Sequence, residues 1–461
     1  MTPATPPVPP ASVDYDAAPL VAFHLRVAVA SVGGVYADGF GLGIIGIALS
    51  SAAPGLHLPA MWLGLLGGAS LAGLFLGALA TGPIADRIGR RPVYAWNMIV
   101  AAIASALQGL AGSGAVLLVL RVVIGIVLGT DYVVSKALLT EFMPLRVRAR
   151  VLSLLSVAWA GGYASAYALG AAMSGVGPGA WRWMLVASAL PCLLVAPLRL
   201  GMPESPVWLV RRGHPDRAAR VVEARLGTGV RPPAPLGAVR LATAWSALFA
   251  PACRVRTFVA CAFFTCQVVP YFAIGTFVTQ VMAALHLSGG YVGGIVYNVA
   301  IFLGAVGGVL VIDRISRRRF LIGSFLTAAL AMLALSVLPD PPAIVMIALF
   351  AVFAGVVSGA SNLVYVYVPE LFPTMLRASG IGIAVAASRV GSALGTFVLP
   401  LVLAGFGAQT ALGSCFVILM LGAGICWRYA PETRHLGLEA LDRLGIRPEA
   451  DGRAAAATGE G

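Results

Sequence analysis

The chain has 461 residues, of which 59% are hydrophobic and 11% charged, and its formal net charge is +13. Soluble globular domains carry about 25% charged residues, so this composition excludes an ordinary soluble protein and indicates many membrane spans. The positive charge does not indicate a nucleic-acid partner, because the arginines gather in short loops between apolar runs, where they set membrane topology.

The first 25 residues begin with a segment rich in proline and alanine. They lack the basic stretch and short apolar run of a signal peptide, and we expect a disordered tail. Apolar runs of the length that a bilayer requires follow, and each should be a helix because a backbone in lipid must satisfy its own hydrogen bonds. We place twelve, at residues 26–50, 60–84, 93–112, 115–140, 150–172, 182–200, 256–282, 289–311, 320–338, 343–368, 378–405 and 408–429. The predicted fold class is an all-α membrane protein.

Three motifs occur twice, in the same order and about half the chain apart. They are Asp86 to Arg91 with Asp313 to Arg318, Glu141 to Arg148 with Glu370 to Arg377, and Pro203-Glu204-Ser205 with Pro431-Glu432-Thr433. Such a repeat predicts two homologous six-helix bundles, at residues 26–200 and 256–429.

Arginine predicts the orientation of the bundles. Alternate loops carry no Lys or Arg, at residues 51–59, 111–114, 173–180, 283–288, 339–342 and 406–407. The opposite loops, the segment 201–255 and the tail 430–461 are rich in arginine, so we expect them and both termini to be cytoplasmic, in a multi-pass protein of the plasma (inner) membrane. Residues 216–226 have an amphipathic helical pattern and would lie on the membrane surface.

The six cysteines form no C-x-x-C pair, and we interpret them as small core residues. No histidine lies at metal-ligand spacing from a cysteine or glutamate, and no catalytic constellation is present. We therefore expect no enzyme activity, no cofactor and no metal.

Two six-helix repeats with a basic hairpin after the second helix of each resemble the major facilitator superfamily. Its motif Gly-x-x-x-Asp-Arg-x-Gly-Arg-Arg is matched fully at residues 82–91, whereas Val309 and Ser316 replace the glycines of the second copy. The Pro-Glu motifs at 203–209, 369–377 and 431–433 are similar to those of the sugar-porter and metabolite:proton symporter branches.

This resemblance implies a secondary transporter with one central site that opens alternately to either side. The cytoplasmic motifs would form a gate that closes the inner end, although they could also be topology signals alone. The gate residues implied are Gly82, Asp86, Arg87, Gly89, Arg90, Arg91, Glu141, Arg148, Asp313, Arg314, Arg317, Arg318, Glu370 and Arg377.

Charged residues inside the spans are expensive in lipid, so they persist where they function or are paired. Asp38 lies midway along the first span and would carry a coupling proton, because burial favours a neutral carboxyl group; a structural hydrogen bond between helices is the alternative. Phosphate and aromatic-acid symporters often carry a second aspartate where this chain has Gly41. Arg121 is the expected partner of Asp38, by resemblance to sugar symporters, and Asp131 is a second candidate carrier.

Lys136 and Arg389 are candidates for binding an anionic group of the substrate. Lys136 could instead extend to the cytoplasm, and Arg389 could be a packing or gating charge. Polar and aromatic residues expected to complete the site are Tyr132, Trp159, Tyr163, Gln267, Tyr271, Asn298, Asn362 and Tyr365.

Together these features predict a secondary active transporter for a small organic solute, coupled to protons. Three positive and two negative charges within the spans favour a carboxylate or related metabolite. A sugar or polyol facilitator, a drug:proton exporter and a membrane sensor that moves no solute are the alternatives. The expected partners are the small-molecule substrate, protons and the lipid bilayer, with the protein as a monomer.

Overall fold

The computed structural model describes residues 13–233, 247–251, 253–287, 290–312, 314–338, 341–372 and 376–433, without the side chains of residues 149, 290, 365, 377 and 378. Asp313, residues 1–12 and 434–461 of the two predicted tails, and the side chains of Tyr365 and Arg377 therefore lie outside the described part of the chain.

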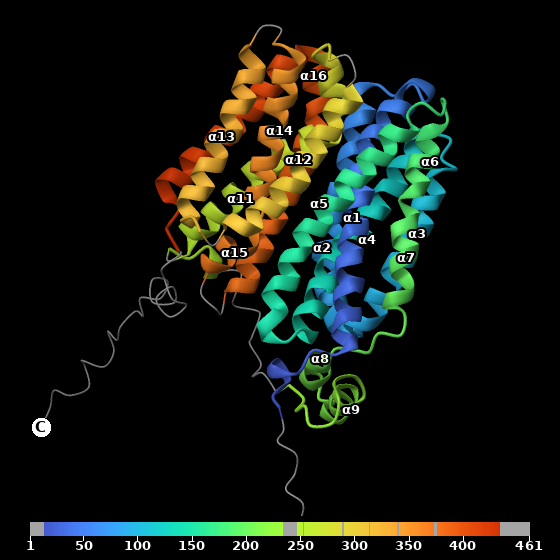
Figure 1. Cartoon of the computed structure of the whole chain (residues 1–461), viewed down its shortest axis with the longest axis vertical. Coiled ribbons are helices and arrows are strands. Elements are labelled where there is room, and N and C mark those ends of the chain that lie inside the picture. Colours follow the sequence, from blue (N-terminus) through green and yellow to red (C-terminus); the bar gives the residue numbers. More distant parts are fainter. Residues whose placement is uncertain are drawn as a thin grey trace, which may run out of the picture.

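Long apolar helices form two bundles that stand side by side (Figure 1). The first bundle contains α1 (Ala22–Gly55), α2 (Ala60–Ile88), α3 (Arg90–Gln108), α4 (Gly114–Phe142), α5 (Leu145–Met173), α6 (Ala180–Ala187) and α7 (Ala189–Arg199). The second contains α11 (Arg254–Ala284), α12 (Gly290–Val311), α13 (Arg317–Val337), α14 (Ala343–Ala360), α15 (Leu363–Glu370) and α16 (Arg377–Tyr429).

The prediction of an all-α membrane fold is confirmed. Ten stretches of helix among the described residues are long and apolar enough to cross a membrane. The helix α16 crosses twice, because it reverses at Gly407, whose φ of 83° lies in the region that glycine adopts readily. With α3, the helices make twelve crossings. The predicted span 343–368 is divided into α14 and α15, and the predicted span 182–200 into α6 and α7.

Glycines let the helices of the first bundle approach closely. A side chain at Gly39 of α1 would meet the backbone of Trp159 in α5, and one at Gly125 of α4 would meet the backbone of Ser70 in α2. Backbone atoms cannot move aside as a flexible side chain can, so these positions accept only small residues. The close contacts hold α1 against α5 and α4 against α2, and α1 and α4 both line the central cavity described below.

Two ends of the molecule differ in charge. We call the end that holds the arginine-rich loops and the connecting segment the basic end, and the opposite one the far end. At the basic end, α8 (Pro206–Arg211) and α9 (Pro215–Leu226) lie beneath the first bundle (Figure 1).

The start of the described chain is held at this basic end. Val13 forms backbone hydrogen bonds with Gly229 (2.7 Å) and Arg231 (2.8 Å) of the connecting segment, and Asp16 forms an ion pair with Arg148 (2.7 Å). The start of the described chain is therefore bound to the linker and to α5.

Toward the far end the two bundles touch closely. A side chain at Gly46 of α1 would meet the backbone of Thr276 in α11, and one at Gly64 of α2 would meet the backbone of Phe397 in α16. The hydroxyl groups of Tyr167 and Thr279 also share a hydrogen bond of 2.8 Å across the seam. Main-chain contact of this kind closes the far end in this structure.

Replacing Gly64 with valine should weaken that closure, because the added side chain meets the Phe397 carbonyl. We expect single cysteines placed at the far end to be labelled faster and those at the basic end more slowly. Gly55→Val is the control, since a side chain there meets no atom within 4 Å. Identical labelling of the two variants would contradict the role assigned to Gly64.

Candidate functional site

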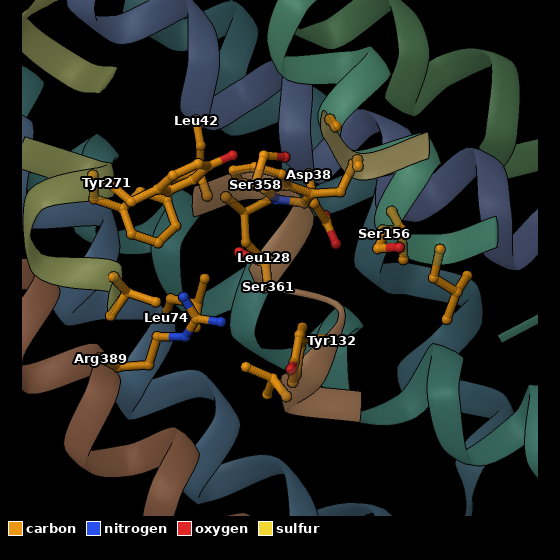
Figure 2. Close-up of a pocket in the computed structure, with 18 of the residues that line it drawn as sticks. Asp38, Leu42, Leu74, Leu128, Tyr132, Ser156, Tyr271, Ser358, Ser361 and Arg389 are labelled. Carbon is orange, nitrogen blue, oxygen red and sulfur yellow. The ribbon is translucent and has the colours of Figure 1, made fainter. Parts of the chain in front are cut away.

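A cavity of about 100 Å³ lies between the two bundles, and Figure 2 shows its walls. The spacing of its residues follows the helix period. On α1 it is lined by Asp38 and Leu42, and on α4 by Leu128, Tyr132 and Lys136, all at intervals of four residues that place them on one face of each helix. Of the predicted site residues, those that line the cavity are Asp38, Tyr132, Lys136, Trp159, Tyr271 and Arg389.

Two cations of this cavity, one from each bundle, lie beside the same aromatic ring. The Lys136 ammonium group lies 3.2 Å from the centre of the Tyr132 ring, and the Arg389 guanidinium group lies 5.6 Å from the same ring. Phe272 is also within 5.8 Å of Arg389. Aromatic faces attract cations, so Tyr132 holds both charges beside the empty space without neutralising them. The Arg389 Nε atom has no hydrogen-bond partner among the described residues, and Lys136 is part of the cavity wall.

An aromatic surface joins the two bundles across the cavity. The Trp159 ring of α5 is stacked on Tyr163 with centroids 5.2 Å apart. It also lies 6.1 Å from Tyr271 and 5.8 Å from Phe272, both in α11. Such ring pairs stabilise the contact beyond simple burial, and they present a flat apolar face to anything bound in the cavity.

Asp38 is the acidic group of the cavity and is only 4% exposed. Its Oδ1 atom has no hydrogen-bond partner among the described residues. The carboxyl group lies close enough to Asp131, Arg199 and Lys136 to interact electrostatically with each. A buried carboxyl group with an unsatisfied oxygen is chemically suited to take up and release a proton.

Asp131 belongs to a buried ion pair rather than to the cavity lining. Its carboxylate pairs with Arg199, and neither side chain is exposed to solvent. Asn97 and Ser135 donate further hydrogen bonds to it, at 3.2 and 3.0 Å. The Arg199 guanidinium group also donates to the backbone carbonyl of Ala30. The pair therefore connects α1, α3, α4 and α7.

Sequence reasoning missed Arg199. This arginine ends the predicted span 182–200, where a cation is expected to reach the membrane surface. Instead it is buried and also stacked on Tyr94, with 4.1 Å between the guanidinium carbon and the ring centre. The presence of Asp131 inside a span was the available signal, because a carboxylate at that depth requires a partner.

The expected pair between Arg121 and Asp38 is not formed. Arg121 is fully buried, donates to the backbone carbonyl of Gly41 at 3.1 Å, and makes no ion pair with any described residue. Position 41 is a glycine, so the guanidinium group meets a backbone carbonyl there and no side-chain carboxylate. Arg121 does not line the cavity.

Several predicted polar residues hydrogen-bond other parts of the protein instead of lining the cavity. Gln267 of α11 donates to the carbonyl of Val357 in α14 at 2.9 Å, whereas Asn298 donates to the carbonyl of Gly294 in its own helix, α12, at 2.8 Å. Asn362 accepts a hydrogen bond of 2.9 Å from Ser156 across the seam. Tyr163 supports Trp159 from outside the cavity lining. Lining residues that the sequence did not suggest include Ser156, Phe264, Phe272, Ser358 and Ser361.

The repeated Pro-Glu motifs serve as helix caps at the basic end. Glu204 accepts hydrogen bonds from the backbone N–H groups of Arg90 (2.9 Å) and Arg91 (3.2 Å), at the start of α3. Glu432 does the same for Arg317 and Arg318 at the start of α13, both at 3.2 Å. A carboxylate at a helix N-terminus satisfies free N–H groups and complements the helix dipole.

The predicted gate residues form ion pairs within each bundle. Arg90 pairs with Asp86 at 2.9 Å and with Glu141 at 3.5 Å. Arg317 pairs with Glu370 at 3.8 Å in the second bundle. Of the remaining predicted gate residues, the structure leaves exposed Arg87, Arg91 and Arg314, and partly exposed Gly82 and Arg318. No ion pair between described residues crosses the seam, and the gating role remains a prediction.

Comparison with known families matches residues 26–444 of the chain to the model described as "sugar (and other) transporter". The chain belongs to this transporter family. It is therefore a multi-pass membrane transporter of the sugar and metabolite type and not an enzyme.

Two relatives from Escherichia coli strain K12 are similar over almost their full length. The chain is 37% identical to the inner membrane metabolite transport protein YgcS, over 94% of this chain and 97% of that protein. It is 35% identical to the putative metabolite transport protein YaaU, over 95% and 98%. Among solved structures, the partially occluded inward open conformation of the E. coli xylose transporter XylE matches with a TM-score of 0.75 at 19% identity, over 90% of this chain and 99% of that one. This likeness supports the major facilitator fold.

The buried ion pair should be essential to the stability of the first bundle. Arg199→Gln leaves Asp131 charged and unpaired, so we expect the free energy of unfolding to fall by about 3–5 kcal/mol. The double variant Arg199→Gln/Asp131→Asn should recover much of that loss, because no buried charge is left alone. Arg26→Gln, which removes an arginine from the same helix junction without touching an acid, is the control. Unfolding in detergent measures all three, and a double variant as unstable as the sum of its single variants would contradict this account.

Proposed function

We propose that this protein is a proton-coupled secondary transporter of a small organic carboxylate or closely related metabolite. The observation that supports this proposal most strongly is that Lys136, Arg389 and Asp38 line one cavity between two bundles. Figure 2 shows Arg389 and Tyr271 on one side of it and Tyr132 and Ser156 on the other. The cavity thus offers cations for an anionic group and an acid for a proton.

The direction of the molecule in the membrane follows from its arginines. The basic end would face the cytoplasm, with both termini there, in the plasma (inner) membrane. Because the far end is closed by backbone contacts in this structure, the conformation would correspond to an inward-facing state. The basic-end pairs of Arg90 and Arg317 would then hold each bundle's inner end rigid while the bundles move.

Anion recognition rests on two charges with different geometries. Arg389 presents a planar guanidinium group, which can bind a carboxylate through two parallel hydrogen bonds, whereas Lys136 provides a compact charge. The serine hydroxyl groups of the cavity would bind the polar remainder of the substrate, and the Trp159 surface its apolar part.

A neutral sugar or polyol is the second candidate substrate. It is favoured by the fold shared with XylE, a xylose transporter, and by the serine hydroxyls and Trp159, since sugars bind through hydroxyl groups and stack on aromatic rings. A neutral substrate leaves no reason for two cations in the cavity, so the carboxylate is the first choice.

Charge selectivity distinguishes these two substrates. If Arg389 binds a carboxylate, Arg389→Gln should weaken binding of the acid at least tenfold and that of its amide analogue by less than twofold. Lys136→Gln should act in the same direction. Tyr271→Phe serves as the control that removes a polar cavity group without changing charge. Binding can be followed by the thermal stabilisation of purified protein with each ligand; equal losses for acid and amide would favour the neutral substrate.

Proton coupling should depend on Asp38. Asp38→Asn imitates the protonated acid, so we expect it to abolish uphill uptake driven by a pH gradient while counterflow of substrate, which needs no net proton movement, continues. Reconstituted vesicles measure both processes. The comparison variant is Asp131→Asn, scored only if it retains counterflow, because the loss of this carboxylate also disturbs Arg199.

The two variants give separable results. Accumulation by Asp38→Asn but not by Asp131→Asn would transfer the role to Asp131. Accumulation by both would show that transport is not coupled to protons at these acids, and the symport proposal would be wrong.

A further inference from the structure

Two adjoining cavities open on the outer side of the second bundle, away from the central site. The first, of about 840 Å³, lies at the basic end and is lined by Arg314, Arg318, Arg319 and Trp427 among others. The second, of about 420 Å³, is a groove between α12, α13 and α14. Arg319 lines both of them, so the arginine pocket continues directly into the groove.

The groove exists because its floor lacks side chains. Gly307 of α12 and Gly323 of α13 line it, and a side chain added at either would meet no protein atom within 4 Å. Leu310 beside it is 62% exposed and Leu330 is 63% exposed, as expected of helix faces that meet lipid chains. The groove is therefore a largely apolar channel in which no side chain covers the backbone at the two glycines.

The pocket that adjoins it contains three arginines and lies at the basic end, where we expect the membrane surface. Trp427 is 73% exposed, and tryptophan is enriched at the membrane interface. The Arg319 side chain makes no hydrogen bond or ion pair with a described residue, and Arg318 donates to the backbone carbonyl of Trp427 at 2.5 Å. Glu432 also lines the pocket, but its carboxylate caps α13 and accepts from the Ser316 hydroxyl.

Protein covers the matching hairpin of the first bundle. There the helix α8 lies over the matching hairpin, with Trp208 Nε1 and Arg212 Nη2 donating to the carbonyl of Asp86 at 3.0 and 2.6 Å. Among the described residues, one hairpin is therefore covered by α8, whereas the arginines of the other line a cavity.

We propose that this pocket and groove together bind one anionic diacyl phospholipid. Its phosphate would be held by the arginines, and one acyl chain would lie along the glycine floor. Guanidinium groups match phosphate oxygens, and basic pockets between membrane helices select anionic headgroups. The site is separate from the central cavity and does not depend on which solute the protein transports.

The headgroup part is tested with the full-length protein in detergent, using phosphatidylglycerol and phosphatidylcholine with identical chains and counting bound lipid by native mass spectrometry. Phosphatidylglycerol should bind at least tenfold more tightly. Arg319→Gln should weaken its binding about fivefold, the effect of one arginine near a lipid surface. The matched control is Arg254→Gln, which removes an exposed arginine from the same end of the same bundle outside the pocket and should leave affinity unchanged.

The groove part is tested by Gly323→Leu, which fills the channel without a protein clash and should weaken lipid binding at least fivefold. Gly424→Leu places the same side chain at another exposed glycine with equal open space, outside the groove, and should have no effect. Equal losses within either pair of variants would overturn the proposal. So would glycerol phosphate binding as tightly as the lipid, or lipid binding only after removal of residues 434–461, which would assign the pocket to the chain's own C-terminal segment.

Discussion

The buried ion pair between Asp131 and Arg199 is the interaction on which the first bundle depends. Each charge alone would be very costly at that depth, and together they are tolerable only because Asn97, Ser135 and the Ala30 carbonyl complete their hydrogen bonds. The groups come from four helices. Those helices cannot separate without exposing an unpaired charge to lipid, so the pair favours movement of the bundle as one rigid body.

The two halves are alike at the basic end and unlike in the membrane interior. Glu204 and Glu432 cap matching helices, and Arg90 and Arg317 form matching ion pairs with Glu141 and Glu370. Within the spans, by contrast, the first bundle holds acids and bases together. In the described part of the second bundle, Arg389 is the one charged side chain placed well inside a span. The two halves therefore share the helix caps and ion pairs of the basic end, whereas the ionisable groups within the described spans are concentrated in the first bundle.

The fold was predictable because span length, arginine placement and the internal repeat are all patterns in the linear sequence. The cavity was predictable only in part. Asp38, Lys136 and Arg389 could be found, since a charge inside an apolar run is visible in sequence. The partner of Asp131 was not, because Arg199 lies at a span end and its depth depends on how α7 packs. Gln267 and Asn298 show the same limit, since a polar residue that hydrogen-bonds a backbone carbonyl of its own or a neighbouring helix has the same sequence pattern as one that faces a substrate.

The charges of the cavity also favour a particular sense of coupling under the proposed function. Lys136 and Arg389 are contributed by different bundles, and Asp38 lies near Lys136. A proton on Asp38 removes the negative charge that competes with an anionic substrate for those cations. Proton and anion then bind more strongly together than apart, and by reciprocity the bound anion favours the protonated carboxyl group. The anion would contact Arg389 in one bundle and Lys136 in the other, so its contacts change when the bundles move. The free energy of the cavity that holds both proton and anion therefore differs most between the two arrangements of the bundles. A ligand shifts a conformational equilibrium only through such a difference, which makes symport the natural direction for an anion at this site.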